Sequence, residues 1–189
     1  MTNNDEHMAP VIPLFAVAPA VADEAQSADV RADAEAALLR KLRTRSLSVS
    51  EARKVLNESG ALGADVEEII DDCIRRGYLE DRQLAEALLR SGVERKGMGR
   101  AAVARTIAQR GIERSVIDEV LDSEPNDDAQ RALDFARKKA ASLGYLDREV
   151  AVRRLAGQLA RRGFSASALS VASRAVDEAR KPAGGVRFS

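Results

Sequence analysis

The sequence has very few residues of the kinds that build chemical sites. Its 189 residues include one cysteine, Cys73, and one histidine, His7. A lone cysteine cannot form a disulfide within the chain, so no oxidising compartment is implied and we expect a cytoplasmic protein. A structural zinc site, which usually takes four cysteine or histidine ligands, is excluded within one chain. One histidine near the N-terminus cannot supply a catalytic base or a metal site, so the sequence predicts a non-enzymatic protein without metal or cofactor.

Aromatic residues and long apolar runs are also scarce. Aromatic residues make up 3% of the sequence and tryptophan is absent, whereas hydrophobic residues together reach 45%. A core of Leu, Ile, Val and Ala suits helices better than strands, so we expect an all-α protein. No stretch approaches the ~18 consecutive apolar residues of a membrane span. The apolar stretch at 8–22 follows an acidic start and contains three prolines, which favours a disordered tail over a secretory signal.

The net charge of zero conceals an uneven distribution of charge along the chain. Residues 1–35 hold seven acidic residues against one arginine, a net charge of −6, so the rest of the chain carries +6. From Arg131 to the end there are thirteen basic and five acidic residues. A basic folded part suits a partner with negative charge, either nucleic acid or an acidic groove on a protein.

Three glycines recur at nearly equal intervals. Gly60, Gly111 and Gly163 are 51 and 52 residues apart, and we call them the repeat glycines. The positions eight and four residues before each repeat glycine, and six and nine residues after it, are apolar in all three copies. These distances follow helical spacing, and glycine suits the residue that ends a helix with a positive φ. The sequence therefore predicts three tandem three-helix repeats that stack into an elongated, curved array.

Turn and linker signals place the boundaries of these repeats. We expect repeat 1 over 34–80, repeat 2 over 81–124 and repeat 3 over 129–180, with the turn-rich sequence SEPNDD before repeat 3. Residues 1–33 are expected to form a disordered, acidic tail rich in proline and alanine, and 181–189 a flexible C-terminal tail.

Several single residues have predicted structural roles. Ser48 and Glu51 fit a capping box at the start of a helix. Cys73 lies on an apolar helical stripe and is expected to be a small core residue. Tyr78, directly after a glycine stop, is expected to be a packing anchor, and Asp81 is expected to cap the helix that follows.

Basic residues gather around the second and third repeat glycines. Cations in the last turn of a helix stabilise the helix dipole, which explains some of them locally. As a recurring set they predict a basic strip along one side of the array. The GxG in RKGMGR lacks the spacing of a phosphate-binding loop, so we expect a turn there, and the acidic run EEIIDD is expected to be solvated surface. The basic residues that make up this predicted strip are Arg95, Lys96, Arg100, Arg105, Arg110, Arg153, Arg154, Arg161 and Arg162.

Five short motifs, taken in order, resemble the RecX family of bacterial regulatory proteins. They are an R-x-x-S-x-x-E pattern at 45–51, GYLED at 77–81, RKGMG at 95–99, QRGI at 109–112 and RRGF at 161–164. The resemblance covers roughly residues 34–178. The chain departs from the family pattern at Ala52, where Leu is common, at Leu84, where Phe is common, and at Ser59, where a basic residue is usual.

The resemblance implies three tandem three-helix repeats and a function that spacing alone does not show. RecX proteins bind the filament of the RecA recombinase and restrain its ATPase, strand-exchange and co-protease activities, which modulates recombination and the SOS response. The resemblance implies a monomer that lies in the groove of the filament, and it leaves open whether the protein also contacts DNA there and whether it caps or coats the filament. The contact residues that the resemblance implies are Tyr78, Arg95, Lys96, Arg100, Arg110, Arg161 and Arg162.

Two other classes of function remain open at this point. The repeats resemble helix-turn-helix modules, so direct DNA binding is the main alternative, and it would be sensitive to salt. An inert helical scaffold for another partner is the third. A gel shift without RecA tests direct DNA binding. A pull-down that retains a partner but never RecA would indicate the scaffold.

Overall fold

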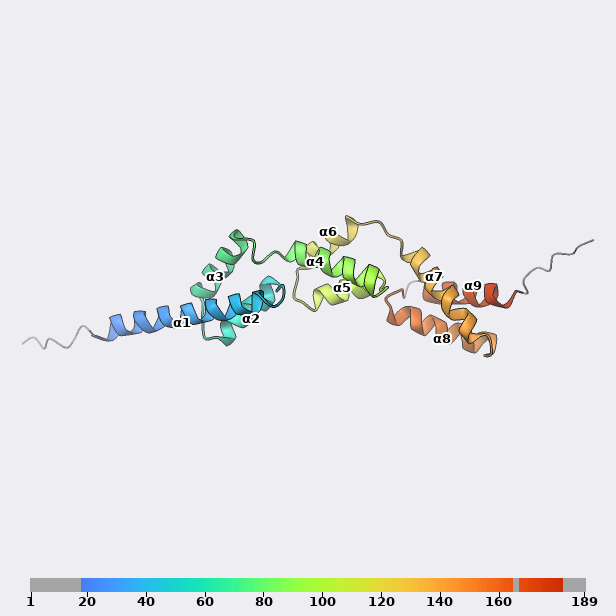
Figure 1. The fold of residues 1–189 in the computed structure, drawn as a ribbon, viewed down its shortest axis with the longest axis horizontal. Coiled ribbons are helices and arrows are strands. Elements are labelled where there is room, and N and C mark those ends of the chain that lie inside the picture. Colours follow the sequence, from blue (N-terminus) through green and yellow to red (C-terminus); the bar gives the residue numbers. More distant parts are fainter. Residues whose placement is uncertain (1–17, 165–166, 182–189) are drawn as a thin grey trace, which may run out of the picture.

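The computed structural model describes residues 18–164 and 167–181, with side chains described from residue 27 onward in these ranges. All regular secondary structure in these ranges is helical, which confirms the all-α prediction. The helices follow one another along one long axis, so the described chain is elongated (Figure 1). The ends of the expected tails, residues 1–17 and 182–189, lie outside the described residues. None of the described helices is long and apolar enough to cross a membrane.

The first set of helices, which we call group 1, has its own hydrophobic core. It comprises α1 (Ala18–Leu42), α2 (Val49–Glu58) and α3 (Ala64–Arg75). Buried side chains from all three helices and from the loop after each of them form the core. Its largest fully buried members are Leu38, Leu47, Leu56, Ile70 and Leu79.

Helix α1 begins earlier than the sequence predicted. Residues 18–33, which we expected to be part of the tail, form its first turns. The alanine-rich sequence favours a helix. Contacts with α3 hold it, because Arg31 binds the carboxylates of Asp65 at 3.0 Å and Glu68 at 2.7 Å.

Groups 2 and 3 also have separate cores. Group 2 comprises α4 (Asp81–Arg90), a π-helical turn (Ser91–Arg95), α5 (Arg100–Ala108) and α6 (Arg114–Asp122). Group 3 comprises α7 (Asp128–Ala140), a 3₁₀ turn (Ala141–Leu143), α8 (Arg148–Arg161) and α9 (Ala168–Arg180). Extensive helix–helix packing occurs inside each group and not between groups. The view that the three groups are copies of one repeat, with the boundaries given above, stays a prediction.

The repeat glycines have the backbone conformation that the sequence predicted. Gly60, Gly111 and Gly163 follow α2, α5 and α8 with φ of 93°, 76° and 93°. One of the aligned apolar positions lies outside the core, because Leu169, six residues after Gly163, is 66% exposed. Helix α9 buries its alanine-rich face instead, and Ala168 takes the place expected for its neighbour.

Candidate partner-binding residues

The seven candidate contact residues fall into two sets in the structure. Arg100, Arg110 and Arg162 form hydrogen bonds that join neighbouring groups or close a loop, as described below. The side chains of the other four are exposed, and among the described residues they have no hydrogen-bond or ion-pair partner. These four are Tyr78, Arg95, Lys96 and Arg161.

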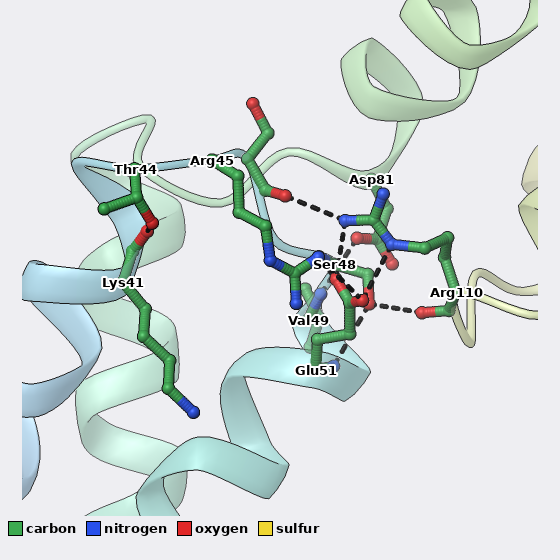
Figure 2. A network of polar contacts seen from close by, with 9 residues as sticks. Lys41, Thr44, Arg45, Ser48, Val49, Glu51, Asp81 and Arg110 are labelled. Carbon is green, nitrogen blue, oxygen red and sulfur yellow. Dashed lines mark hydrogen bonds and ion pairs between the residues drawn. The ribbon is translucent and has the colours of Figure 1, made fainter.

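Arg110 reaches from group 2 into group 1 and binds a carboxylate there. It lies between the end of α5 and the repeat glycine Gly111. Its Nε and Nη2 donate to the two carboxylate oxygens of Glu51, both at 2.7 Å, and Nη2 also donates to the Ser46 carbonyl at 2.8 Å (Figure 2). Paired N–H···O bonds of this kind are the strongest that a guanidinium makes. We call this contact region joint 1–2.

Glu51 is held from several sides in joint 1–2. Its side chain accepts the Ser48 backbone N–H at 3.1 Å and a bond from Arg45 at 3.2 Å. The Ser48 hydroxyl accepts the Glu51 backbone N–H and donates to the Arg110 carbonyl, which confirms the predicted capping box and adds a contact to group 2. Burial alone would raise the pKa of Glu51, but the hydrogen bonds from Arg110, Ser48 and Arg45 bring it below its usual value.

Asp81 also links the first two groups, and its predicted role is wrong. It is the first residue of α4, and the preceding cap position, Glu80, makes no side-chain cap. The Asp81 carboxylate instead accepts the backbone N–H of Val49, the first residue of α2, at 2.9 Å (Figure 2). The acid therefore caps a helix of group 1, because its side chain faces that helix and not its own. Burial raises the pKa of Asp81, and the bond from Val49 opposes this.

The same plan recurs between groups 2 and 3, in a region that we call joint 2–3. Asp128 is the first residue of α7, and its carboxylate accepts the backbone N–H of Arg100, the first residue of α5, at 2.9 Å. The Gly99 backbone N–H donates to the Arg162 carbonyl at 2.7 Å. Ser48 and Gly99 both stand twelve residues before a repeat glycine, so each joint ties the start of one group's second helix to the residue before the next repeat glycine.

The side chain of Arg162 uses different acceptors from that of Arg110. Its Nη1 donates to the backbone carbonyls of Lys96 at 3.0 Å and Gly97 at 3.2 Å. Its guanidinium lies 4.3 Å from the centre of the Phe135 ring, which is a cation–π contact. The Arg110 side chain therefore binds group 1 through an ion pair, whereas the Arg162 side chain binds group 2 through backbone carbonyls and stacks on Phe135 of its own group.

Glycines let the backbones meet closely at both joints. A Cβ on Gly163 would lie 2.5 Å from the Cβ of Ala102, and one on Gly111 would lie 2.5 Å from the hydroxyl of Ser50. A Cβ on Gly99 would lie 2.7 Å from the Gly163 carbonyl oxygen. Gly99 has a φ of −73°, which any residue adopts. Position 99 therefore requires glycine only because the neighbouring group lies so close to it. The sequence offered no signal for this beyond the turn motif KGMG.

Arg100 serves the end of a helix in its own group. Its guanidinium donates to the Glu124 carbonyl at 2.9 Å and to the carbonyl of Leu121 near the end of α6. The bond to Leu121 satisfies a carbonyl that the end of α6 leaves without a helical partner, and the bond to Glu124 holds the segment just after the helix. Its side chain therefore fixes the segment that leads from group 2 to group 3.

Tyr78 is not the packing anchor that the sequence predicted. It is 52% exposed, whereas its neighbour Leu79 is 1% exposed and belongs to the core of group 1. The tyrosine lies beside Leu42 and Arg43 at the end of α1, in a depression of about 380 Å³. Cys73 is buried as predicted, and burial raises the pKa of its thiol.

Comparison with known proteins gives a consistent picture. A sequence model described as "RecX, second three-helix domain" matches residues 81–121. The regulatory protein RecX of Streptomyces coelicolor is 38% identical over 116 residues, which cover 59% of this chain and 61% of that relative. The RecX of Corynebacterium efficiens is 32% identical over 165 residues, 82% of this chain and 75% of the relative. For the RecX of Halorhodospira halophila the figures are 33% over 142 residues, 75% and 87%.

Two solved structures share the fold. The crystal structure of RecX from Lactobacillus salivarius has a TM-score of 0.69 at 18% identity, over 80% of this chain and 99% of that one. Another crystal structure of a regulatory protein RecX has a TM-score of 0.64 at 23% identity, over 82% of this chain and 76% of that one.

Proposed function

This chain belongs to the RecX family of regulatory proteins, and from that premise we propose that it binds the filament of the RecA recombinase and restrains it. The expected effects are lower ATPase, strand-exchange and co-protease activity of RecA, and through them modulation of recombination and of the SOS response. The chain does this without bond chemistry of its own. The distribution of its exposed cations is the observation that supports the proposal most directly.

Three of the exposed cations that have no partner among the described residues lie on two successive groups of an elongated chain. Arg95 and Lys96 are exposed at the end of the π-helical turn in group 2, and Arg161 is exposed at the end of α8 in group 3. A filament presents the same subunit surface at regular intervals. A long protein with cations on successive groups can therefore bind more than one subunit at once, which strengthens binding without new kinds of contact.

Tyr78 supplies a different kind of contact on group 1. Its half-exposed ring beside Arg43 offers apolar area with a polar tip. Side chains of this kind are frequent in protein interfaces. We assign Tyr78, Arg95, Lys96 and Arg161 to direct contact with the filament.

Binding of this kind restrains RecA by a shift of population. If the regulator binds one conformation of the filament better than another, that conformation becomes more populated in proportion to the difference in affinity. For inhibition, the exposed cations need only bind the filament conformation with low ATPase activity more tightly than the conformation with high activity.

The test is RecA ATPase on single-stranded DNA with the protein titrated in. We expect inhibition by the wild type and weaker inhibition by an Arg95→Glu, Lys96→Glu double variant. The control is Lys138→Glu, which reverses an exposed charge of α7 outside the candidate set. Unchanged ATPase and strand exchange with excess wild-type protein would rule the proposal out.

Direct DNA binding is the alternative, and one observation favours it. Helix α8 carries Arg153 and Arg154 in addition to Arg161, all exposed and without partners among the described residues. Fluorescence anisotropy of labelled DNA without RecA separates the two functions. Tight binding that falls steeply with salt would favour this alternative, because each phosphate contact releases counterions.

A further inference from the structure

We propose that Arg110 and Arg162 act as positioning residues, which fix each group against the one before it, and that they do not contact the partner. Their effect on a filament is then indirect, through the curvature and spacing of the whole array. The significance for regulation rests on the function proposed above, whereas the structural part stands without it.

The first argument is that the donors of Arg110 are already in use. Its guanidinium makes three hydrogen bonds, to both oxygens of Glu51 and to the Ser46 carbonyl, and its side chain is 22% exposed. Contact with a partner would require these bonds to break. Glu51 would then remain partly buried without its main partner, which is costly for a carboxylate.

The second argument comes from the place of arginine in the sequence. The residue before the repeat glycine is Arg110 in group 2 and Arg162 in group 3, but it is Ser59 in group 1. A contact residue would be useful in every group. A residue that holds the preceding group is needed only where another group precedes it. Among the described residues, group 1 is the first group. Its repeat glycine, Gly60, lies instead beside α1 of the same group, since a Cβ on Gly60 would be 3.4 Å from Val30.

The third argument is that few bonds determine how the groups are placed. Extensive packing is confined to the interior of each group. The relative orientation of groups 1 and 2 therefore depends mainly on a short set of bonds. They are those of the Arg110 side chain to Glu51 and Ser46, of the Ser48 hydroxyl to the Arg110 carbonyl and of Asp81 to Val49, with the close contact at Gly111. Loss of the Arg110 bonds should leave each core intact and loosen the angle between the groups.

A charge swap separates positioning from contact. The variants are Arg110→Glu, Glu51→Arg and the double variant with both changes. We expect each single variant to need about tenfold more protein for half-inhibition of RecA ATPase, because two residues that bind each other are coupled. The double variant should recover part of this loss, since it restores the ion pair but not the bond from the Ser48 N–H to Glu51. A contact role for Arg110 predicts that the double variant remains as weak as Arg110→Glu.

A distance measurement tests the structural part without RecA. Spin labels are attached at Leu62 in group 1 and at Asp122 in group 2, because both side chains are exposed. A Cys73→Ala background removes the native thiol. We expect a narrow distance distribution in the wild type, a broad one in Arg110→Glu and a narrow one again in the double variant. An unchanged distribution in Arg110→Glu would overturn the proposal.

Two further variants keep the result interpretable. Arg110→Lys keeps the charge but lacks the planar guanidinium that binds both carboxylate oxygens. If Arg110 positions the groups, the distance distribution should broaden, whereas if it contacts a partner through its charge, the distribution should not change. Arg105→Glu reverses an exposed charge on α5, the helix that precedes Arg110, and should leave the distribution unchanged. Circular dichroism confirms that each variant is folded. If the wild type fails to inhibit RecA while the distance results hold, the proposed function fails and the joint stands.

Discussion

At the scale of single residues, Gly99 is the most constrained position that lacks any backbone strain. Its φ is −73°, yet a Cβ would lie 2.7 Å from the Gly163 carbonyl oxygen and 2.8 Å from the Phe164 ring. Gly99→Ala should therefore force groups 2 and 3 apart and lower the free energy of unfolding by about 1–3 kcal/mol, as overpacking usually does. Urea denaturation of the full chain measures this.

Gly144→Ala is the matched control for that change. Gly144 has a φ of −61°, and a Cβ there would meet only the Ala141 carbonyl oxygen, at 3.6 Å, an ordinary contact. We expect no loss of stability, since alanine also restricts the unfolded chain more than glycine does. Equal effects of the two substitutions would show that close approach at joint 2–3 is not what requires Gly99.

Glu51 makes joint 1–2 sensitive to acid. Its pKa in the folded protein lies below the usual value of 4.5, so its ionised form stabilises the fold above about pH 4.5. This contribution is lost as the pH falls through the lowered pKa. The Tm difference between the wild type and Glu51→Gln should be largest near neutral pH and should shrink below pH 4.5.

Glu94→Gln serves as the reference for the acid experiment. Glu94 is exposed and has no hydrogen-bond or ion-pair partner in the described part of the chain. Its Tm difference from the wild type should stay small at every pH. A Glu51→Gln difference that is constant down to pH 3 would contradict an ionised Glu51 as the centre of the joint.

The residues that could be predicted from the sequence are those whose role is local. The positive φ of the repeat glycines and the capping box at Ser48 follow from spacing along one helix. Gly99 and Arg110 could not be assigned in this way, because their partners, Gly163 and Glu51, are 64 and 59 residues distant. The arginine pattern suggested a basic surface, and only the coordinates place Arg110 and Arg162 between groups.

At the scale of helices, an acidic side chain of one group caps the start of a helix in the group before it. The Asp81 carboxylate on α4 accepts the first N–H of α2, and that of Asp128 on α7 accepts the first N–H of α5. The start of α2 is therefore stabilised by a residue of another group, with a gain typical of a helix cap.

Asp81→Ala tests this cap between groups. We expect a loss of about 1 kcal/mol and faster hydrogen exchange at the Val49 amide, with little change at the start of α4. Asp81→Asn keeps a side-chain oxygen as acceptor and should preserve most of the protection. Faster exchange confined to α4 would restore the sequence-based expectation that Asp81 caps its own helix.

Helix positions were predictable where the periodic residues are large, and less so where they are alanine. Leucine, isoleucine and valine marked the buried faces of groups 1 and 2. In α9 the buried face is mostly alanine, at Ala168, Ala172 and Ala175, so the aligned apolar position six residues after Gly163 falls on Leu169, which is exposed. The early start of α1 was missed because alanine and charged residues suit both a helix and a solvated tail.

At the scale of the whole molecule, three separate cores in a row predict that stability is assembled from units and their joints. Each group packs mainly within itself, and each joint adds a limited number of bonds. In such arrays the total is close to a sum of unit stabilities and nearest-neighbour terms. The loss of one end group should therefore weaken its neighbour without unfolding the rest.

A chain that ends at Asn126 tests this directly, because it lacks all of group 3 and keeps groups 1 and 2. We expect it to remain helical, with a Tm lower by several degrees, since group 2 loses the Arg162 and Asp128 bonds and the cover over Gly99. Hydrogen exchange should rise around Lys96 and Arg100, at the lost joint, and stay unchanged in group 1, which that joint does not touch. Circular dichroism and amide exchange give both readings. A shortened chain that is wholly unfolded would mean that the three groups fold only as one cooperative body, and that the joints carry far more of the stability than their few hydrogen bonds imply.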